Sequence, residues 1–289
     1  MPAIKRILFP VDFSGRTEGA APFVAALARS AQAEVTLLHV LDAADYLYAG
    51  GELGGYVAAD VYAAHKAQST ERLEKFLRKE FPTATRKVLE GEPAARIVSE
   101  ANSGNYDLIM MPTHGLGPFR RYLIGSVTAK VLHDARCPVW TGVHMEDAAG
   151  QPAPEALKEV FCAVDLGPQS DAALRWAADA AADHQAKLLL VHAVPGVQTR
   201  PEKYFDTEFH TALRQEAGAE IAKLQQRVHT NAEVLLVDGE PATAIRDAVR
   251  ERHASLLVIA RGSAAEGFGR LRKHAYDIIR SAPCPTVSV

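Results

Sequence analysis

The residues best suited to chemistry form a loop in which two glycines, Gly115 and Gly125, are separated by nine residues. Because glycine has no Cβ, the backbone N–H groups around both positions can turn toward an anion. Ser126 and Thr128 add hydroxyl groups directly after the second glycine. The helix expected to begin near Val127 would point its unpaired N–H groups and the positive end of its dipole at the same place. The spacing therefore predicts a phosphate-binding loop.

The elements that must position this loop belong to a repeat. Four short blocks of the first half recur in the same order in the second half. The blocks pair residues 7–12 with 160–165, 35–40 with 188–193, 90–94 with 238–242, and 135–139 with 282–286. In both halves, apolar runs rich in Val, Ile and Leu alternate with helical stretches, which is typical of a parallel sheet covered on both faces. The sequence therefore predicts tandem α/β domains built from repeated βα units.

The length of 289 residues suits two domains of roughly 100 to 200 residues each. Residues 146–154 lack periodicity and contain Gly and Pro, so we expect a linker there, between a first domain at 1–145 and a second at 155–289. The Glu-Pro pairs at 92–93 and 240–241 predict helix starts, because proline in the first turn gives up a hydrogen bond that it would not have made. Residues 42–63, rich in Gly and Tyr, are expected to form a surface insertion.

Composition excludes several classes of function. A net charge of -3 gives no long-range attraction for nucleic acid or for an anionic membrane. The first residues contain no stretch long enough for a signal peptide or a transmembrane helix, which predicts a cytoplasmic protein. The three cysteines are too scattered for a disulfide framework and are expected to be buried thiols. The eleven histidines show no metal-ligand spacing, so we expect no metal site and interpret His39 and His192 as hydrogen-bonded wall residues.

The sequence resembles the universal stress protein family in five motifs taken together. They are the strand ends Pro10-Val11-Asp12 and Leu38-His39-Val40, the turn Gly91-Glu92-Pro93, the pair Gly125-Ser126 and the strand Cys137-Pro138-Val139. The resemblance spans nearly all of both halves. It implies a Rossmann-like, doubly wound, parallel five-stranded sheet in each half, with strand order 3-2-1-4-5 and a nucleotide site where the strand order reverses.

The same resemblance implies a set of site residues for ATP or another adenine nucleotide, with Mg²⁺ as the ion that accompanies the phosphates. These residues are Pro10, Val11, Asp12, Val40, Thr113, His114, Gly115, Gly125, Ser126, Val127 and Thr128. In ATP-binding relatives, the residue matching Asp12 contacts the nucleoside and the backbone around Val11 and Val40 meets adenine. The loop matching 115–128 wraps the phosphates.

Two departures from the family pattern bear on this expectation. Pro112 replaces the first glycine of the pattern, which removes an N–H donor and fixes φ near -65°. In the second half, Arg272 and Lys273 stand where Gly125 and Ser126 stand in the first. The sequence therefore predicts one nucleotide-binding domain and a second domain, with a degenerate loop, that is structural or regulatory.

Three functions remain open at this point. The first is a stress-response protein that binds an adenine nucleotide and signals by its bound state, with at most slow hydrolysis, because no catalytic nucleophile is evident. The second is a nucleotide-independent interaction module, and the third is an ATP-cleaving enzyme of a related fold. The final strand of each half would leave an open sheet edge. We therefore expect the two halves to pair these strands within one chain, as an internal pseudo-dimer, and a further homodimer stays open.

Overall fold

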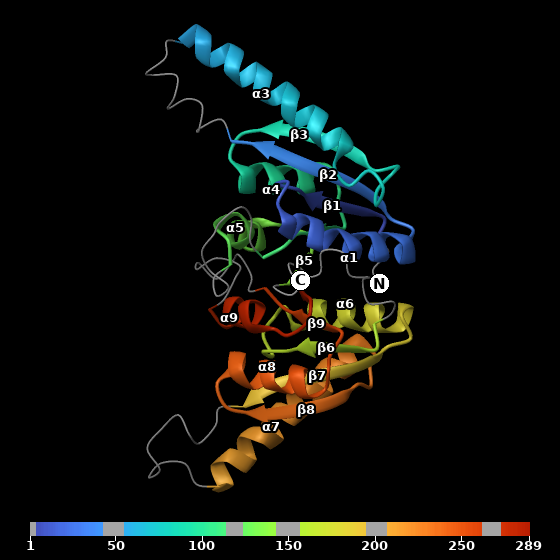
Figure 1. Ribbon diagram of the computed structural model, residues 1–289. Helices are drawn as coiled ribbons and strands as arrows, with labels where there is room; N and C mark the ends of the chain where they lie inside the picture. The colour runs from blue at the N-terminus through green and yellow to red at the C-terminus, as the bar shows by residue number, and fades with distance from the viewer. Residues whose placement is uncertain (1–3, 43–54, 114–123, 143–156, 195–206, 262–272) are drawn as a thin grey trace. The chain divides into compact units, whose positions relative to one another are not determined.

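The structure is a computed structural model that describes residues 4–42, 55–113, 124–142, 157–194, 207–261 and 273–289 (Figure 1). The chain forms two compact units, one built mainly from residues 3–139 and the other mainly from residues 154–289. The predicted linker, residues 146–154, lies outside the described residues.

The first half alternates strands and helices throughout. Its elements are β1 (Arg6–Pro10), α1 (Gly15–Ala31), β2 (Glu34–Leu41), α3 (Gly55–Lys75), β3 (Thr85–Glu90), α4 (Pro93–Ser103), β4 (Leu108–Met110), α5 (Ser126–Asp134) and β5 (Val139–Thr141). The strands lie in the order β3-β2-β1-β4-β5, and β1 pairs in parallel with both β2 and β4. The predicted α/β class and the strand order 3-2-1-4-5 are confirmed for this half.

The second half repeats the same plan. Its elements are β6 (Glu159–Ala163), α6 (Ser170–Asp183), β7 (Lys187–Val194), α7 (Thr207–Val228), β8 (Glu233–Asp238), α8 (Pro241–Glu251), β9 (Leu256–Ile259), α9 (Lys273–Ser281) and β10 (Thr286–Ser288). The strands lie in the order β8-β7-β6-β9-β10, and β6 pairs in parallel with both β7 and β9. The repeat read from the sequence is therefore also a repeat of topology.

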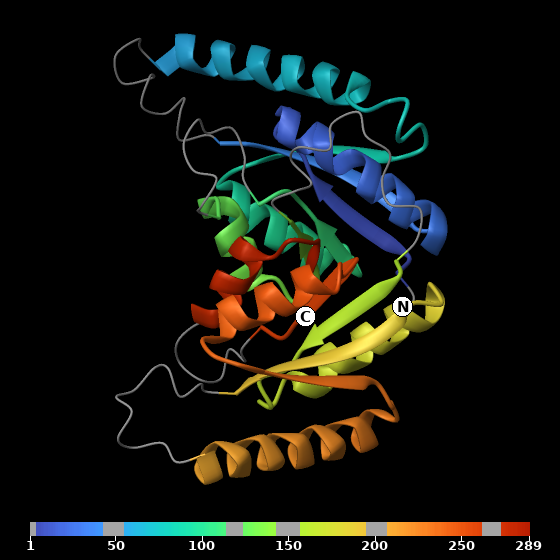
Figure 2. The same ribbon diagram turned by 60° about the horizontal axis from the view of Figure 1, so that its bottom comes forward.

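Helices cover both faces of each sheet. In the first half α4 packs against α5, and in the second half α6 packs against α7 while α8 packs against α9. Figure 2 shows α3 running along the β2–β3 side of its sheet and α7 along the β7–β8 side of its own. Because both faces are covered, the first strand of each half is buried along almost its whole length, and Phe9 and Phe161 are fully inaccessible.

The turn from the third strand of each half to the next helix explains one repeated block. Gly91 has φ of 129° and Gly239 has φ of 127°, and residues with a Cβ rarely adopt this backbone conformation. The following glutamate caps the helix. Glu92 accepts from the N–H groups of Ala94 and Ala95, and Glu240 accepts from that of Thr243. The block Gly-Glu-Pro is therefore a complete local signal for a turn followed by a helix.

Two expectations about smaller features differ from the structure. Residues Gly55–Ala63 belong to helix α3 rather than to a surface insertion. This stretch is rich in alanine, whose high helix propensity outweighs the neighbouring glycines. Cys137 is only half-buried, whereas Cys162 and Cys284 are buried as predicted. No helix within the described parts of the chain is both long and apolar enough to cross a bilayer.

Candidate functional site

The site of the first half is built around Asp12, two residues after the end of β1. Its Oδ1 atom accepts three hydrogen bonds, from the N–H of Ser14 (3.0 Å), the hydroxyl of Ser14 (2.6 Å) and the hydroxyl of Thr17 (2.6 Å). Ser14 also caps helix α1, so the start of the helix and the orientation of the carboxylate depend on the same residue. All three hydrogen bonds end on Oδ1, so Oδ2 of the half-buried Asp12 can accept from a ligand.

His39 fixes the backbone beside this carboxylate. Its Nδ1 lies 2.8 Å from the carbonyl oxygen of Val11, and because a carbonyl only accepts, Nδ1 is the donor. The N–H of Val11 donates to the carbonyl of Leu38 (2.8 Å). Burial lowers the pKa of His39, although the hydrogen bond to Val11 and the charge of Asp12 oppose the shift. The ring is therefore neutral at pH 7, and both polar backbone groups of Val11 are already engaged.

Phe13 forms an aromatic wall that sequence reasoning missed. Its backbone has φ of 61°, an unusual value for a residue with a Cβ. The ring lies 4.4 Å from the ring of His39 and 5.1 Å from that of Phe76, and the guanidinium of Arg72 sits 4.4 Å above it. The sequence does contain a signal for this residue, because the position after the aspartate that follows the first strand is bulky and apolar in both halves. Its counterpart Leu166 has φ of 60°.

The N-terminus of α5 supplies the second part of the site. Gly125 caps the helix with φ of -60° and no side-chain cap, and its N–H donates to the carbonyl of Thr113 (2.8 Å). Hydrogen bonding within the helix begins with the N–H of Ala129, which donates to Gly125 (2.8 Å). The helix itself therefore offers no acceptor to the N–H groups of residues 126–128, and these groups are suited to an anion.

The predicted site residues are distributed as follows. Pro10, Val11 and Asp12 lie at the carboxyl end of β1, Val40 lies near the end of β2, and Thr113 follows β4. Since β1 pairs in parallel with both β2 and β4, these ends meet at one edge of the sheet. His114 and Gly115 lie outside the described residues.

The two hydroxyls of α5 differ in exposure. Ser126 is exposed, whereas Thr128 is 2% exposed and its hydroxyl donates to the carbonyl of Pro112 (3.1 Å). In this arrangement the Thr128 hydroxyl ties helix α5 to the chain after β4. Proline therefore contributes its carbonyl at a position where it has no N–H to offer.

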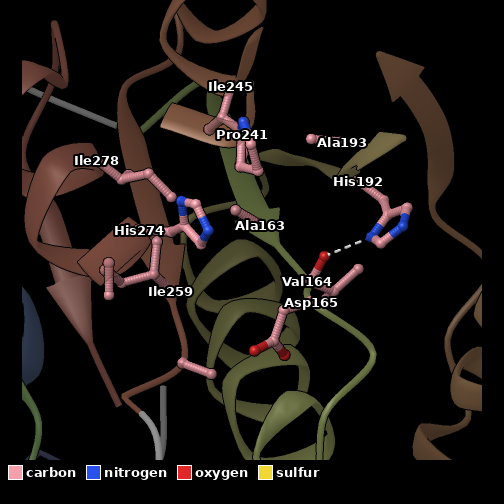
Figure 3. A pocket seen from close by; sticks show the side chains of 12 residues that line it. Ala163, Val164, Asp165, His192, Ala193, Pro241, Ile245, Ile259, His274 and Ile278 are labelled. Carbon is pink, nitrogen blue, oxygen red and sulfur yellow. Dashed lines mark hydrogen bonds between the residues drawn. The ribbon is translucent and has the colours of Figure 1, made fainter. Parts of the chain in front are cut away.

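The second half repeats the first part of this geometry. Oδ1 of Asp165 accepts from the N–H of Gly167 (2.9 Å) and from the hydroxyl of Ser170 (3.1 Å). Nδ1 of His192 lies 2.8 Å from the carbonyl of Val164, the same contact that His39 makes. A pocket of about 240 Å³ opens beside these residues, at the carboxyl ends of β6, β7 and β9 (Figure 3). Helices α8 and α9 contribute the remaining lining residues, among them His274.

The described parts of the chain contain no cluster of three or more His, Cys, Asp or Glu side chains that could hold a metal ion. The groups at this edge of the first sheet are a carboxylate that can accept from hydroxyl groups, an aromatic side chain beside it, and a helix N-terminus suited to an anion. The fold that carries these groups is a doubly wound α/β sheet, present here in tandem, whose ligands bind at the carboxyl edge of the strands.

Comparison with known proteins identifies the family. The model of the universal stress protein family matches residues 3–141 and again residues 156–289, and the chain belongs to this family. A universal stress protein of Methanocaldococcus jannaschii is 29% identical over 135 residues, which cover 47% of this chain and 79% of the relative. One from Synechocystis is 32% identical over 140 residues, covering 47% of this chain and 83% of the relative.

A solved structure shares the fold over almost the whole of both chains. A universal stress protein from Archaeoglobus fulgidus aligns with a TM-score of 0.70 over 98% of this chain and 97% of its own, at 20% sequence identity. At this level of identity the comparison establishes the fold of both halves.

Proposed function

We propose that the first half binds an adenine nucleotide, ATP or AMP, and that the protein acts in the stress response through its nucleotide-bound state. The observation that carries this proposal is that Asp12 follows β1 and helix α5 follows β4, two neighbouring parallel strands. Three hydrogen bonds on Oδ1 hold the carboxylate while Oδ2 remains able to accept from ribose hydroxyls. The uncapped N-terminus of α5 suits the phosphates.

The remaining residues of the site fit the same ligand. Neutral His39 keeps the Val11 carbonyl in place, and Phe13 presents an aromatic surface held by Arg72. Gly125 adopts φ of -60°, which any residue can adopt, so we attribute the glycine to close approach of the phosphates rather than to backbone conformation. Mg²⁺ would be held mainly by the phosphates and water, as is usual for this ion. We expect at most slow hydrolysis.

The repeat offers a matched pair of variants that tests the proposal. In Asp12→Asn the amide Oδ1 can still accept the three loop hydrogen bonds, while a donor replaces the Oδ2 acceptor. Loss of a hydrogen bond to a charged group costs about 1.5 to 3 kcal/mol, so the affinity for ATP should fall roughly 10- to 100-fold. Asp165→Asn makes the same change in the second half and should leave ATP affinity unaltered. Calorimetric titration of the full-length protein measures both.

Equal losses of affinity in the two variants would place the nucleotide elsewhere. If neither ATP nor AMP binds to the native protein, and none is extracted from it after purification, the proposal fails. The protein would then be a nucleotide-independent interaction module of the same fold. That second candidate is favoured by one feature, the presence of Pro112 where a backbone donor would otherwise stand.

The proposal extends to assembly and location. All three cysteines lie in described parts of the chain and none forms a disulfide, which agrees with the reducing cytoplasm. An open sheet edge presents unpaired backbone N–H and C=O groups that can pair with another strand. We therefore infer that the last strands of the two halves pair within the chain, with a homodimer as a further assembly. Chemical cross-links between residues near β5 and β10, combined with the mass of the species in solution, test both inferences.

A further inference from the structure

The second half has an open sheet edge that lies away from the candidate site. Strand β8 is at the outer end of its sheet, and the strand that pairs with it among the described residues is β7 (Figure 1). The N–H of Gly239 donates to the carbonyl of Val194 on β7 (3.0 Å). Because backbone groups alternate in direction along a strand, those of residues 234, 236 and 238 point away from β7. They form an edge with which another strand can pair.

The side chains of β8 differ from those of the matching outer strand of the first half, β3. Residues 234–237 are Val-Leu-Leu-Val, and all four are half-buried rather than buried. At the positions of Val234 and Leu235, β3 carries Arg86 and Lys87. Charged residues on an edge strand oppose pairing with another chain, whereas a run of apolar residues with high β-propensity favours it. The second half is therefore the one with an apolar outer edge.

The backbone of the two outer edges also differs. In the first half, Nε of Arg96 donates to the carbonyl of Glu90, the last residue of β3 (2.5 Å). The second half carries Ala244 at the position of Arg96, and alanine has no donor for the matching carbonyl of Asp238. The edge that an arginine closes in the first half is therefore open at this point in the second.

Two side chains of α7 occupy other parts of the β8 edge. Gln225 accepts from the N–H of Ala232 (2.5 Å) and donates to its carbonyl (3.3 Å), so the edge is closed just before β8 begins. Arg214 donates through Nη2 to the carbonyl of Leu236 (3.1 Å) and through Nη1 to the carboxylate of Asp238 (2.7 Å). The planar guanidinium is held by both contacts and lies across the middle of the apolar run.

A second copy of β8 fits this edge in an antiparallel register centred on Leu236. Residues 234, 236 and 238 of one copy then face residues 238, 236 and 234 of the other, so that the outward backbone groups of this stretch find partners. Asp238 lies opposite Val234 of the second copy and does not face another carboxylate, which would destabilise the pair. The neighbouring register would need Ala232, whose backbone groups α7 already holds.

We propose that β8 is a self-association surface whose partner is β8 of a second copy of this chain, and that Arg214 opposes the pairing by covering the Leu236 carbonyl. Displacement of the guanidinium opens the whole stretch from residue 234 to residue 238. This assembly joins two second halves through β8, so it is distinct from a homodimer at the last strands. It also does not depend on nucleotide binding by the first half.

The test combines release of the edge with a cysteine at its centre. In the full-length protein, Arg214→Ala should lower the dissociation constant for self-association at least tenfold in analytical ultracentrifugation. Adding Leu236→Cys should give an intermolecular disulfide under mild oxidation, because the Cα atoms of a hydrogen-bonded antiparallel pair lie about 5.5 Å apart, within disulfide range. The double substitution Val234→Arg and Leu235→Lys copies the charges of β3 and should abolish both effects.

The first half supplies matched controls. Lys66, at the position of Arg214, contacts the Glu90 carboxylate (2.5 Å), and Val88 stands where Leu236 stands. Lys66→Ala with Val88→Cys should neither associate nor cross-link above the background that the native cysteines set. If Arg214→Ala does not fold, Arg214→Lys keeps the charge beside Asp238, lacks the fork that reaches both groups, and should give the same disulfide.

Three results would overturn the proposal. The first is the absence of the disulfide when Leu236→Cys is combined with a folded variant of Arg214. The second is equal association or cross-linking in the variants of the first half, which would show that the effect is not specific to β8. The third is a disulfide that persists after Val234→Arg and Leu235→Lys, since two charged edges cannot pair in the stated register.

Discussion

Replacing Thr128 by valine tests whether its hydroxyl stabilises the fold or contacts the ligand. The family resemblance places Thr128 at the phosphates, whereas in the structure its hydroxyl donates to the Pro112 carbonyl over 3.1 Å and the residue is 2% exposed. Valine keeps the shape but leaves that buried carbonyl without this donor. A net hydrogen bond is worth about 0.5 to 1.5 kcal/mol, and an unsatisfied buried group costs about 1 to 3 kcal/mol. We expect Thr128→Val to lower the free energy of unfolding by about 1 to 2 kcal/mol.

The assay combines urea unfolding of the full-length chain with hydrogen exchange of α5, which reports the local effect. ATP affinity should change by less than about tenfold, that is by less than about 1.4 kcal/mol. Thr36 gives a matched control, because it is a buried threonine of β2, 6% exposed, whose hydroxyl makes no hydrogen bond within the described residues. Thr36→Val should leave stability almost unchanged. If Thr128→Val is as stable as the native protein but loses more than tenfold in ATP affinity, the hydroxyl serves the ligand and the reasoning is wrong.

Three further predictions concern the backbone, protonation and thiols. Burial lowers the pKa of His39 below its usual value of about 6.5, so stability should fall as pH drops below about 6.5, and His39→Asn should reduce this loss. Gly239→Ala should cost about 1 to 3 kcal/mol in urea unfolding, because φ is 127° while the nearest atom to a new Cβ lies 3.9 Å away. Cys162 and Cys284 should resist alkylation in the native protein, since burial raises the pKa of both thiols, that of Cys284 to about 12.

Each of these predictions has a contrary outcome. An unchanged pH dependence of stability in His39→Asn would show that other groups dominate acid unfolding. Gly91 shares the backbone conformation, with φ of 129°, but a new Cβ there would meet the Arg96 side chain at 2.9 Å. Gly91→Ala should therefore be at least as damaging as Gly239→Ala, and a milder effect would contradict the argument. Labelling of Cys162 faster than unfolding would show that its strand opens locally.

Much of the fold was predictable because its signals are local. The strand ending in aspartate, the Gly-Glu-Pro turn and the apolar runs each act within a few residues, and the repeat presents every signal twice. The start of α4 illustrates this, since Gly91 provides the turn, Glu92 caps the first N–H groups and Pro93 occupies the first turn. Consistent local signals of this kind select one arrangement of strands and helices.

The details of the site depended on contacts between segments far apart in the chain. The sequence predicted hydroxyls after Gly125, but only packing of α5 against the end of β4 directs the Thr128 hydroxyl to a carbonyl sixteen residues earlier. Phe13 meets Arg72 because α3 crosses the sheet next to the loop after β1. By itself the sequence determined the repeated fold, whereas the tertiary structure decided which polar groups are already engaged and where the strand ends leave room for a ligand.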